Sequence, residues 1–307
     1  MTDPSGDFGK RTGRCERDAS RLLRWGKTLL AAAISAPLLA LSAGAEPAFT
    51  PPALLNSNGN SDVEGDTHPQ IATDGVGNWV AVWHSPENLN GTAGSDLDIF
   101  VTTSTDNAAT WTAPALLNTN GTSDSNSDNS AEIATDGGGN WVATWYSTEN
   151  LNGTAGTDTD IFVATSTDNG ASWTPTALLN TNGNSDLQAD FKPHITTDGA
   201  GNWVAVWYST ENLNGTAGTD WDILVASSGD NGTTWTTPEL LNTNGNSDVG
   251  ADTYPRIATD GGGNWAVVWY SNENLAGTAG TDYDIFIATS VDNSSSWTTP
   301  ALLNANG

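Results

Sequence analysis

The chain has 307 residues, of which 36 are acidic and nine are Lys or Arg, for a formal net charge of −27. This acid excess argues against nucleic acid and anionic membrane surfaces as partners, because clustered Lys and Arg side chains bind phosphate groups. The one cysteine, Cys15, excludes an intramolecular disulfide and a site of several thiolates.

The N-terminal segment predicts an export signal. Seven of the nine Lys and Arg residues lie in the basic region 1–27, and the apolar run 28–45 follows. The run ends with Ala43 and Ala45 on either side of a glycine, the small-residue pattern of signal-peptidase cleavage. An uncleaved membrane anchor is the alternative, since the run is close to the minimum length of a span. Pro37 and the small-residue end favour cleavage.

The mature chain would therefore be 46–307, in a secreted, periplasmic or cell-surface protein. It retains Lys192 and Arg256 as its only Lys and Arg residues, against 32 acidic ones. We expect a glycan or protein ligand, no nucleic acid, and no membrane segment after cleavage. The sequence does not predict the oligomeric state.

A unit of 62 residues recurs four times in the mature chain. The copies cover about 52–113, 114–175, 176–237 and 238–299, and the segment 300–307 follows them. Within each copy, short runs rich in Trp, Val, Ile, Phe and Thr are bounded by Gly, Asn and Asp. This composition is typical of strands joined by turns.

Four strands are predicted in each copy, and in the first they are 71–73, 79–83, 99–103 and 111–117. Both faces of the second strand are apolar, so it needs cover on both sides. Stacking four-stranded sheets around an axis gives that cover, which predicts an all-β fold, a β-propeller of antiparallel blades. The alternatives are a β-solenoid, for which the unit is long, and a string of sandwich domains, for which it is short.

The stretch "ATSTDNGASW", residues 164–173, recurs with small changes in every copy. Its pattern, S-x-D-x-G-x-x-W, resembles the Asp-box of the sialidase-like (neuraminidase) repeat propellers. Ala108 and Ser294 depart from it, since they stand where glycine is expected. Ser and Asp side chains can accept hydrogen bonds from turn amides and Gly permits a positive φ, so the Asp-box acids are predicted to be structural. These acids are Asp106, Asp168, Asp230 and Asp292.

The fourth-strand motif occurs five times and the other three strand motifs occur four times. The extra strand either closes a four-bladed ring or belongs to a larger propeller. The resemblance implies a ring of six blades, which favours the larger propeller.

The resemblance also implies what a catalytic sialidase would need: three arginines for the substrate carboxylate, a tyrosine nucleophile paired with a glutamate, and an aspartate acid/base. Only Arg256 is available after residue 45, and one guanidinium cannot form the triad. Sialidase activity is therefore not expected of this chain. A glycosidase that uses two carboxylates is not excluded, because acidic residues are abundant.

Three functions fit these observations. The leading one is an exported, non-catalytic propeller that binds a glycan or a protein. The second is part of a sialidase-like glycoside hydrolase whose catalytic residues lie outside this chain. The third is a structural or adhesive repeat protein, which the near-identity of the copies favours.

The candidate ligand site comes from positions at which the copies differ. They flank the start of the first strand, where we expect the innermost strands and the long loops to meet, and residues two apart in a strand share a face. Four of the five basic or imidazole side chains of the mature chain fall here. Neutral drift at exposed strand ends is the alternative. The positions are His68, Gln70, Ser130, Glu132, Lys192, His194, Tyr254 and Arg256.

Repeated acidic pairs in the long loops are the candidate metal ligands. Oxygen donors without a basic partner suit calcium, although the spacing is not that of an EF-hand. Asx-turns and a solvated acidic surface are an equally good explanation. No cofactor is required, and calcium fits the pattern. The pairs are Asp96 and Asp98, Asp158 and Asp160, Asp220 and Asp222, and Asp282 and Asp284.

Overall fold

The computed structural model describes residues 51–60, 63–280 and 282–304. The predicted signal peptide, 1–45, lies outside these residues. Contacts separate residues 1–51 from 52–307, and the fold described here belongs to the second part. It consists of four antiparallel sheets of four strands each, so the all-β fold class is confirmed. Among the described residues, no helix is long and apolar enough to cross a membrane.

Each sheet is one blade, with its strands in chain order. Blade 1 contains β1 (Thr67–Thr73), β2 (Trp79–Ser85), β3 (Asp98–Ser104) and β4 (Ala115–Leu116). Blade 2 contains β5 (Asn129–Thr135), β6 (Trp141–Ser147), β7 (Asp160–Ser166) and β8 (Ala177–Leu178). Blade 3 contains β9 (Asp190–Thr197), β10 (Trp203–Ser209), β11 (Asp222–Ser228) and β12 (Glu239–Leu240). Blade 4 contains β13 (Thr253–Thr259), β14 (Trp265–Ser271), β15 (Asp284–Ser290) and β16 (Ala301–Leu302). Short 3₁₀ turns, η1 (Leu89–Gly91) and η2 (Leu275–Gly277), lie in the long loops of blades 1 and 4.

All four strands of blade 1 differ in their bounds from the sequence prediction, β2 and β3 by one or two residues and β1 and β4 by more. The innermost strand β1 begins four residues before the predicted 71–73. The outer strand is only two residues long instead of the predicted 111–117. The chain still follows β3 there, since the Thr112 amide donates to the Thr103 carbonyl (2.9 Å).

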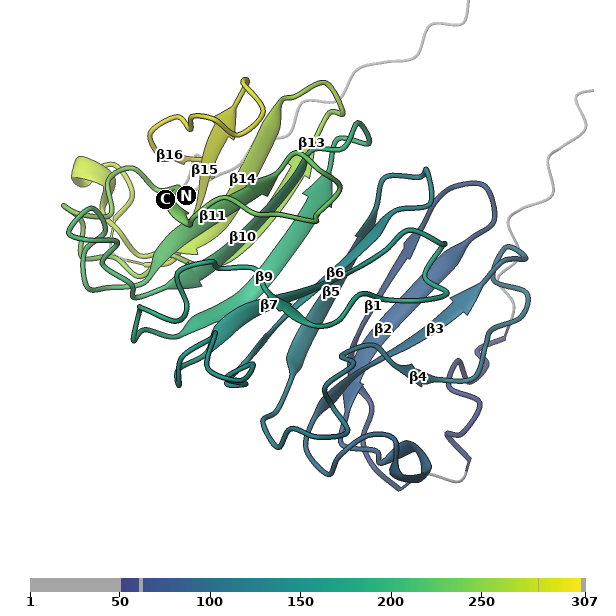
Figure 1. The fold of residues 1–307 in the computed structure, drawn as a ribbon. Coiled ribbons are helices and arrows are strands. Elements are labelled where there is room, and N and C mark those ends of the chain that lie inside the picture. Colours follow the sequence, from purple (N-terminus) through teal and green to yellow (C-terminus); the bar gives the residue numbers. More distant parts are fainter. Residues whose placement is uncertain (1–50, 61–62, 281, 305–307) are drawn as a thin grey trace, which may run out of the picture. The chain divides into compact units, whose positions relative to one another are not determined.

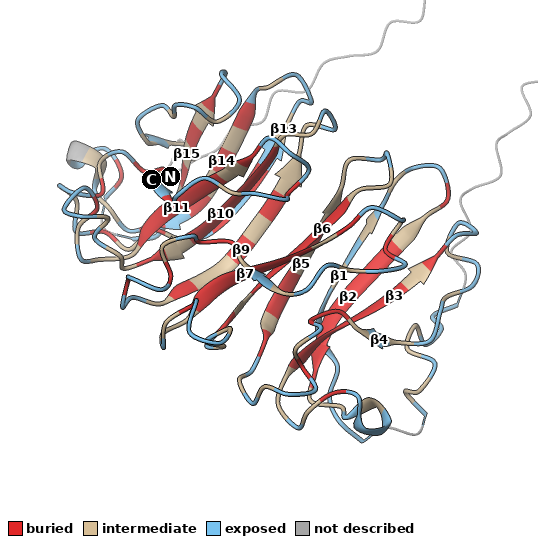
Figure 2. Cartoon of the chain, viewed as in Figure 1, coloured by how far each residue is buried: buried red, intermediate tan, exposed pale blue. Residues whose placement is uncertain are grey.

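The four blades follow one another in chain order, and their inner strands β1, β5, β9 and β13 contact in sequence (Figure 1). In each blade one face of the sheet, the valine face, packs on the tryptophan face of the next blade. Val80 and Val82 of blade 1 share a buried cluster with Trp141 and Trp145 of blade 2. Buried residues accordingly fill the central strands, while the connecting loops are largely exposed (Figure 2). The prediction that the second strand is covered on both faces is confirmed for blades 2 and 3, which have a neighbour on each side.

The two outermost faces lack the cover that the internal junctions provide. Ile71, on the tryptophan face of blade 1, is 54% exposed, whereas its counterpart Ile133 in blade 2 is 9% exposed. On the valine face of blade 4, Val268 and Ile285 are half-buried, whereas Val82 in blade 1 is fully buried. Both faces thus carry the kind of apolar surface that an adjacent blade covers at the internal junctions of the described chain.

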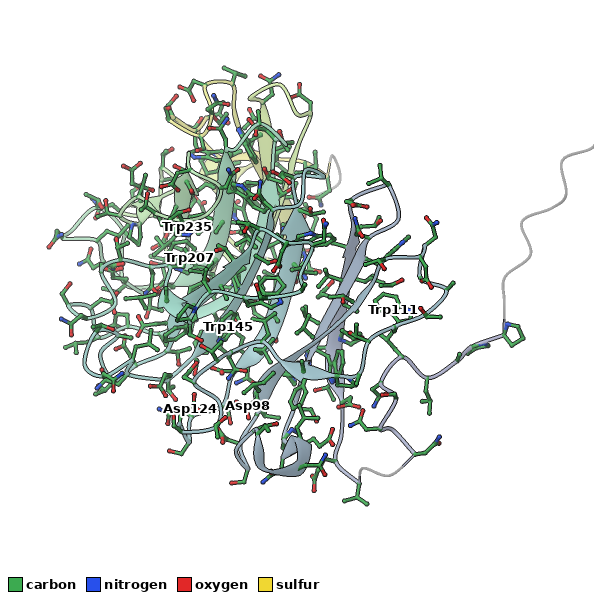
Figure 3. All side chains as sticks on the ribbon, turned by 45° about the vertical axis from the view of Figure 1, so that its right-hand side comes forward. Asp98, Trp111, Asp124, Trp145, Trp207 and Trp235 are labelled. Atoms are coloured by element: carbon green, nitrogen blue, oxygen red, sulfur yellow. The ribbon has the colours of Figure 1, made fainter. Side chains whose placement is uncertain are left out.

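The Asp-box forms the turn between the third and fourth strands, with the contacts predicted for it. In blade 2 the Ser172 amide donates to Asp168 Oδ1 (2.9 Å), and the Gly170 amide donates to Ser166 Oγ (3.0 Å). Hydrogen bonds led by that from the Ser172 side chain lower the pKa of Asp168. Trp173 packs against the cluster between blades 1 and 2. The acid is therefore held as a turn acceptor. Figure 3 labels Trp111 and Trp235, the corresponding Asp-box tryptophans of blades 1 and 3.

Gly170→Ala should lower the free energy of unfolding by about 1–3 kcal/mol. Gly170 has a φ of +78°, and a Cβ there would lie 2.7 Å from Val80 Cγ2 of blade 1. Urea unfolding of the full chain measures the effect. The control is Ala108→Gly, the same turn position in blade 1, where φ is 63° in a half-buried alanine. That change should not destabilise the protein. Equal losses in both variants would contradict the clash between blades.

Candidate functional site

The candidate residues lie at the edge of each blade where the first strand begins, the second ends and the third begins. In blade 1, Thr67 pairs with His84, and Ser85 pairs with Asp98. The same register recurs in the other blades. Antiparallel pairing therefore places the inner-strand residues and the acidic pairs at one edge of the stack.

The inner strands are not regular where the candidate residues lie. The first residue of each predicted pair has a left-handed backbone, with φ between 52° and 54°, and the register with the second strand shifts there. The residues are His68, Ser130, Lys192 and Tyr254. This β-bulge corrects the expectation that each pair projects by simple strand alternation. Proline follows in three blades, and its missing N–H favours a break in the ladder.

Six of the eight predicted residues nevertheless line one cavity of about 70 Å³ beside the inner strands. All four blades contribute to it, and the remaining lining residues are Ala131 and Pro193. The six are His68, Gln70, Ser130, Glu132, Lys192 and Arg256. We call these six residues the central ring.

Hydrogen bonds connect the central ring across the blades. Glu132 Oε1 of blade 2 accepts from Gln70 Nε2 of blade 1 (3.2 Å) and from Arg256 Nη1 of blade 4 (3.3 Å). Lys192 Nζ of blade 3 donates to Ser130 Oγ of blade 2 (2.7 Å). Arg256 keeps 54% of its side chain exposed, while Glu132 is 14% exposed. The ring thus offers an accessible guanidinium above a nearly buried carboxylate.

Burial controls the electrostatics of the central ring. Desolvation raises the pKa of Glu132 to about 7, although the charges of Arg256 and Lys192 oppose the shift. The ring is therefore able to change charge near neutral pH.

Two of the eight predicted residues lie outside the cavity lining. His194 Nδ1 accepts a hydrogen bond from the Ile257 amide of blade 4 (3.2 Å), and burial lowers the pKa of His194 to about 4. Its neutral imidazole satisfies a backbone donor at the blade junction. Tyr254 is half exposed and its ring lies 5.6 Å from that of Tyr208 and 5.9 Å from that of Tyr270. It therefore borders the ring as part of an aromatic surface.

Sequence reasoning missed the role of the penultimate residue of each second strand, which is His84 in β2 and Tyr146 in β6. His84 Nδ1 accepts from the Ser130 amide (2.9 Å), and burial lowers the pKa of His84 to about 4. At the corresponding place, Tyr146 packs under Lys192, whose Nζ lies 5.5 Å from the ring centroid. Each contact joins residues 46 positions apart, in consecutive blades. The aromatic or imidazole type at this repeat position was a signal that could have indicated a role at the blade junction.

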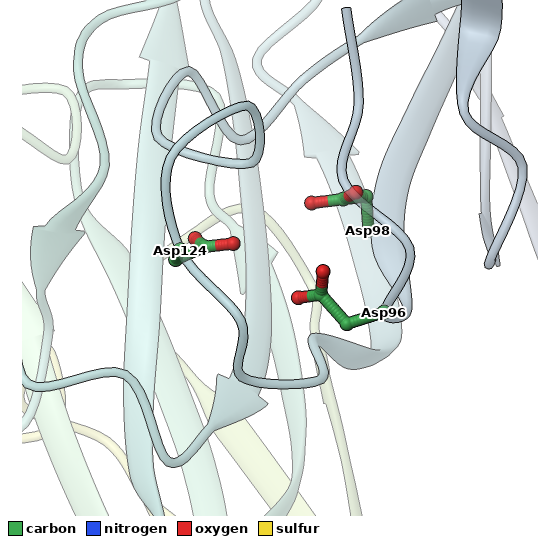
Figure 4. Close-up of side chains that lie close together, drawn as sticks. All are labelled: Asp96, Asp98 and Asp124. Atoms are coloured by element: carbon green, nitrogen blue, oxygen red, sulfur yellow. The ribbon is translucent and has the colours of Figure 1, made fainter. Parts of the chain in front are cut away.

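The predicted acidic pairs also lie at this edge, and the structure adds a third carboxylate to two of them. Carboxylate oxygens of Asp96 and Asp98 lie within 4.8 Å of those of Asp124, which belongs to the spacer before blade 2 (Figure 4). Asp158 and Asp160 are grouped with Asp186 in the same way. The sequence contained the third acid as a repeated spacer residue but did not connect it with the pair.

The other two predicted pairs behave differently. At the third junction, Asp222 is grouped with two spacer acids, Asp248 and Asp252, and Asp220 is not in the group. Asp282 and Asp284 belong to no such group within residues 51–60, 63–280 and 282–304. Asp220 nevertheless contacts Asp248, as Asp158 contacts Asp186, so only the pair Asp282 and Asp284 lacks a third carboxylate among the described residues.

Asparagine side chains organise the acidic groups. Asn180 Nδ2 donates to Asp160 Oδ1 and to Asp190 Oδ2, both at 2.7 Å, while its own oxygen accepts from the Ile161 amide. Burial raises the pKa of Asp160 to about 7, and burial with neighbouring carboxylates raises the pKa of Asp186. The main cause is desolvation, and neighbouring carboxylates add to it for both acids.

Similar solved structures include the leech intramolecular trans-sialidase complexed with 2,7-anhydro-Neu5Ac, with a TM-score of 0.52 at 11% identity. The sialidase NanB of Streptococcus pneumoniae gives 0.51 at 12% identity. Both matches cover 78% of this chain, and 51% and 52% of the respective neighbours. The chain has the sialidase-like β-propeller fold. It thus spans about half the length of these two sialidases. No protein-family model and no curated protein matches the sequence.

Glu132→Gln should reduce the pH dependence of the propeller's stability between pH 4.5 and about 7. The folded-state pKa of Glu132 is raised from 4.5 to about 7, so its contribution is complete below pH 4.5 and is lost as pH rises through about 7. Relative to the variant, the parent protein should lose about 2–3 kcal/mol over this range.

Urea unfolding at several pH values measures this difference. The exposed Glu239 provides the control, Glu239→Gln, which should follow the parent. A parent that gains stability over the variant as pH rises would mean that attraction to Arg256 and Lys192 outweighs burial.

Proposed function

We propose that this sialidase-like propeller is an exported, non-catalytic module that binds a glycan at the central ring. The observation that carries the proposal is the composition of the cavity. Lys192 and Arg256, the only Lys and Arg residues after residue 45, both line it. Their convergence from blades 3 and 4 supports a binding role. Neutral drift would not be expected to place the two rare basic side chains in one cavity.

The surroundings of the cavity favour a glycan over a protein ligand. The cavity is small, and its lining includes charged, amide and hydroxyl groups that can bond to sugar hydroxyls. Tyr254 and Tyr270 are each 49% exposed beside Arg256. Exposed aromatic rings next to polar groups suit a ligand with apolar C–H faces and hydroxyl edges.

The same residues argue against sialidase chemistry. Arg256 is the one arginine available after residue 45, and it is paired with Glu132 at 3.3 Å. A single guanidinium offers a substrate carboxylate far fewer charge-assisted hydrogen bonds than three would. Lowered pKa values at Asp106 and Asp168 also fit turn acceptors and not proton donors.

Lys192→Ala and Arg256→Ala should each weaken glycan binding by about 1–3 kcal/mol, since each removes a charged hydrogen-bond donor. An array of neutral and acidic oligosaccharides selects the probe, and calorimetry with that oligosaccharide measures affinity. Thr167→Glu is the control, because it lowers the net charge equally at the opposite blade edge, in an exposed turn position. Unchanged affinity in the double variant, with normal folding stability, would exclude the ring as the site.

A second candidate, part of a sialidase-like hydrolase, is favoured by the uncovered faces of blades 1 and 4. Further blades could cover Ile71 and Val268 and contribute catalytic groups.

This chain alone should not release sialic acid from a fluorogenic sialoside, because the arginine triad is incomplete. Turnover above the blank that Arg256→Ala abolishes would contradict this prediction and favour the hydrolase.

A further inference from the structure

Acidic side chains of one blade meet those of the following spacer at three successive blade junctions. At the junction of blades 2 and 3, Asp158 and Asp160 come from the start of β7 and Asp186 from the spacer before β9. One carboxylate oxygen of each lies within 4.8 Å of the other two. The groups at the other junctions are Asp96, Asp98 and Asp124, and Asp222, Asp248 and Asp252.

Buried carboxylate oxygens at these junctions have no hydrogen-bond donor. Asp160 is fully buried, and only its Oδ1 is satisfied, by Asn180, while its Oδ2 has no partner. Both oxygens of Asp158 and Oδ1 of Asp186 are also buried without an amide, hydroxyl or basic donor, and these two carboxyl groups face each other. At the third junction, Oδ2 of the fully buried Asp222 has no such donor. At the first junction, the buried oxygens without one are Oδ2 of Asp96 and Oδ1 of Asp124, in half-buried residues. Leaving a buried charged oxygen unpaired is costly, so a positively charged ligand is expected.

No side chain of the described part can supply that charge. Lys192 and Arg256 are the only Lys and Arg residues there, and both line the central ring. Another acid, Asp190, is 1% exposed and shares the Asn180 amide with Asp160. The local excess of negative charge therefore has no protein counterpart.

The backbone holds the acids in a tight cradle that only glycine permits. A Cβ on Gly156 would lie 2.7 Å from the Gly183 carbonyl oxygen and 3.0 Å from Asp158 Oδ1. A Cβ on Gly183 would lie 2.1 Å from Asp160 Oδ1. Equivalent approaches occur at the other two junctions, at Gly94, Gly121, Gly218 and Gly245. The cradle is thus a repeated structure that also brings a carbonyl oxygen beside the carboxylates.

We propose that each of these three junctions binds one calcium ion. Carboxylate and carbonyl oxygens without nitrogen or sulfur donors are the ligands that a hard divalent cation prefers, and the irregular arrangement suits calcium better than the octahedral magnesium ion. Because the ligands come from one blade and from the spacer that leads into the next, the ion would hold consecutive blades together. The site is separate from the central ring and does not depend on glycan binding.

The test is calcium binding by the full chain after removal of metal with a chelator. Equilibrium dialysis with calcium should give about three ions per chain, one for each junction. The melting temperature should rise with calcium by more than with sodium chloride of equal ionic strength, because the ion binds the folded state. Magnesium should bind more weakly. Stoichiometry near zero, or an equal shift with sodium, would overturn the proposal, and tighter magnesium binding would overturn the choice of calcium.

The double variant Asp158→Asn, Asp186→Asn locates one of the ions. Calcium binding should fall from about three ions to about two. In chelator the variant should melt no lower than the parent, since it removes repulsion between carboxylates, and in calcium it should melt lower. Glu64→Gln, an exposed acid elsewhere, is the matched control and should keep all three ions. A variant that binds as much calcium as the parent, or that is destabilised equally with and without calcium, would overturn this assignment.

Discussion

The packing of one blade's valine face on the next blade's tryptophan face is the constraint on which the structure depends. A single four-stranded sheet of this sequence has two apolar faces and cannot bury both by itself. Trp145 and Trp207, both labelled in Figure 3, are fully buried because the preceding blade supplies valines such as Val82 and Val142 as cover. With no disulfide available after residue 45, this packing provides the main favourable term for folding.

The same stacking brings the functional groups together. It fixes the rotation between consecutive blades. That rotation sets the distance between the bulge in the inner strand of one blade and the end of the second strand in the preceding blade. His84 meets Ser130 and Tyr146 meets Lys192 for this reason. It also sets the spacer acids beside the preceding blade's acidic pair, as at Asp124. The central ring and the acidic groups thus both form at the junctions between consecutive blades, at different distances from the inner strands.

Positions that are the same in every copy of the repeat have different roles in the structure from positions that vary among the copies. Positions that pack, such as Trp145, are nearly the same in each copy, because each junction needs the same surface. The Asp-box glycine is less strict, since Ala108 in blade 1 and Ser294 in blade 4 stand at the place of Gly170. The ring positions vary freely in chemistry, from Gln70 to Glu132 to Arg256, because they face a shared opening and not a repeated neighbour. Variation among copies is therefore the best guide to the ligand site in a protein built from near-identical units.

The sequence alone determined the all-β fold, the four blades and the Asp-box turns, because a repeat of 62 residues with period-two apolar strands leaves few ways to bury both faces. It also indicated eight candidate positions, of which six line the central cavity. Tertiary structure decided what depends on distances across blades. It inserted a bulge at Lys192, turned His194 away from the cavity lining to cap a backbone amide, and joined Asp186 to the Asp158 and Asp160 pair. Strand patterns fix which face a side chain takes within one sheet, but contacts between sheets depend on the rotation and spacing of the blades. These are set by the summed packing of many side chains and have no local signature in the sequence.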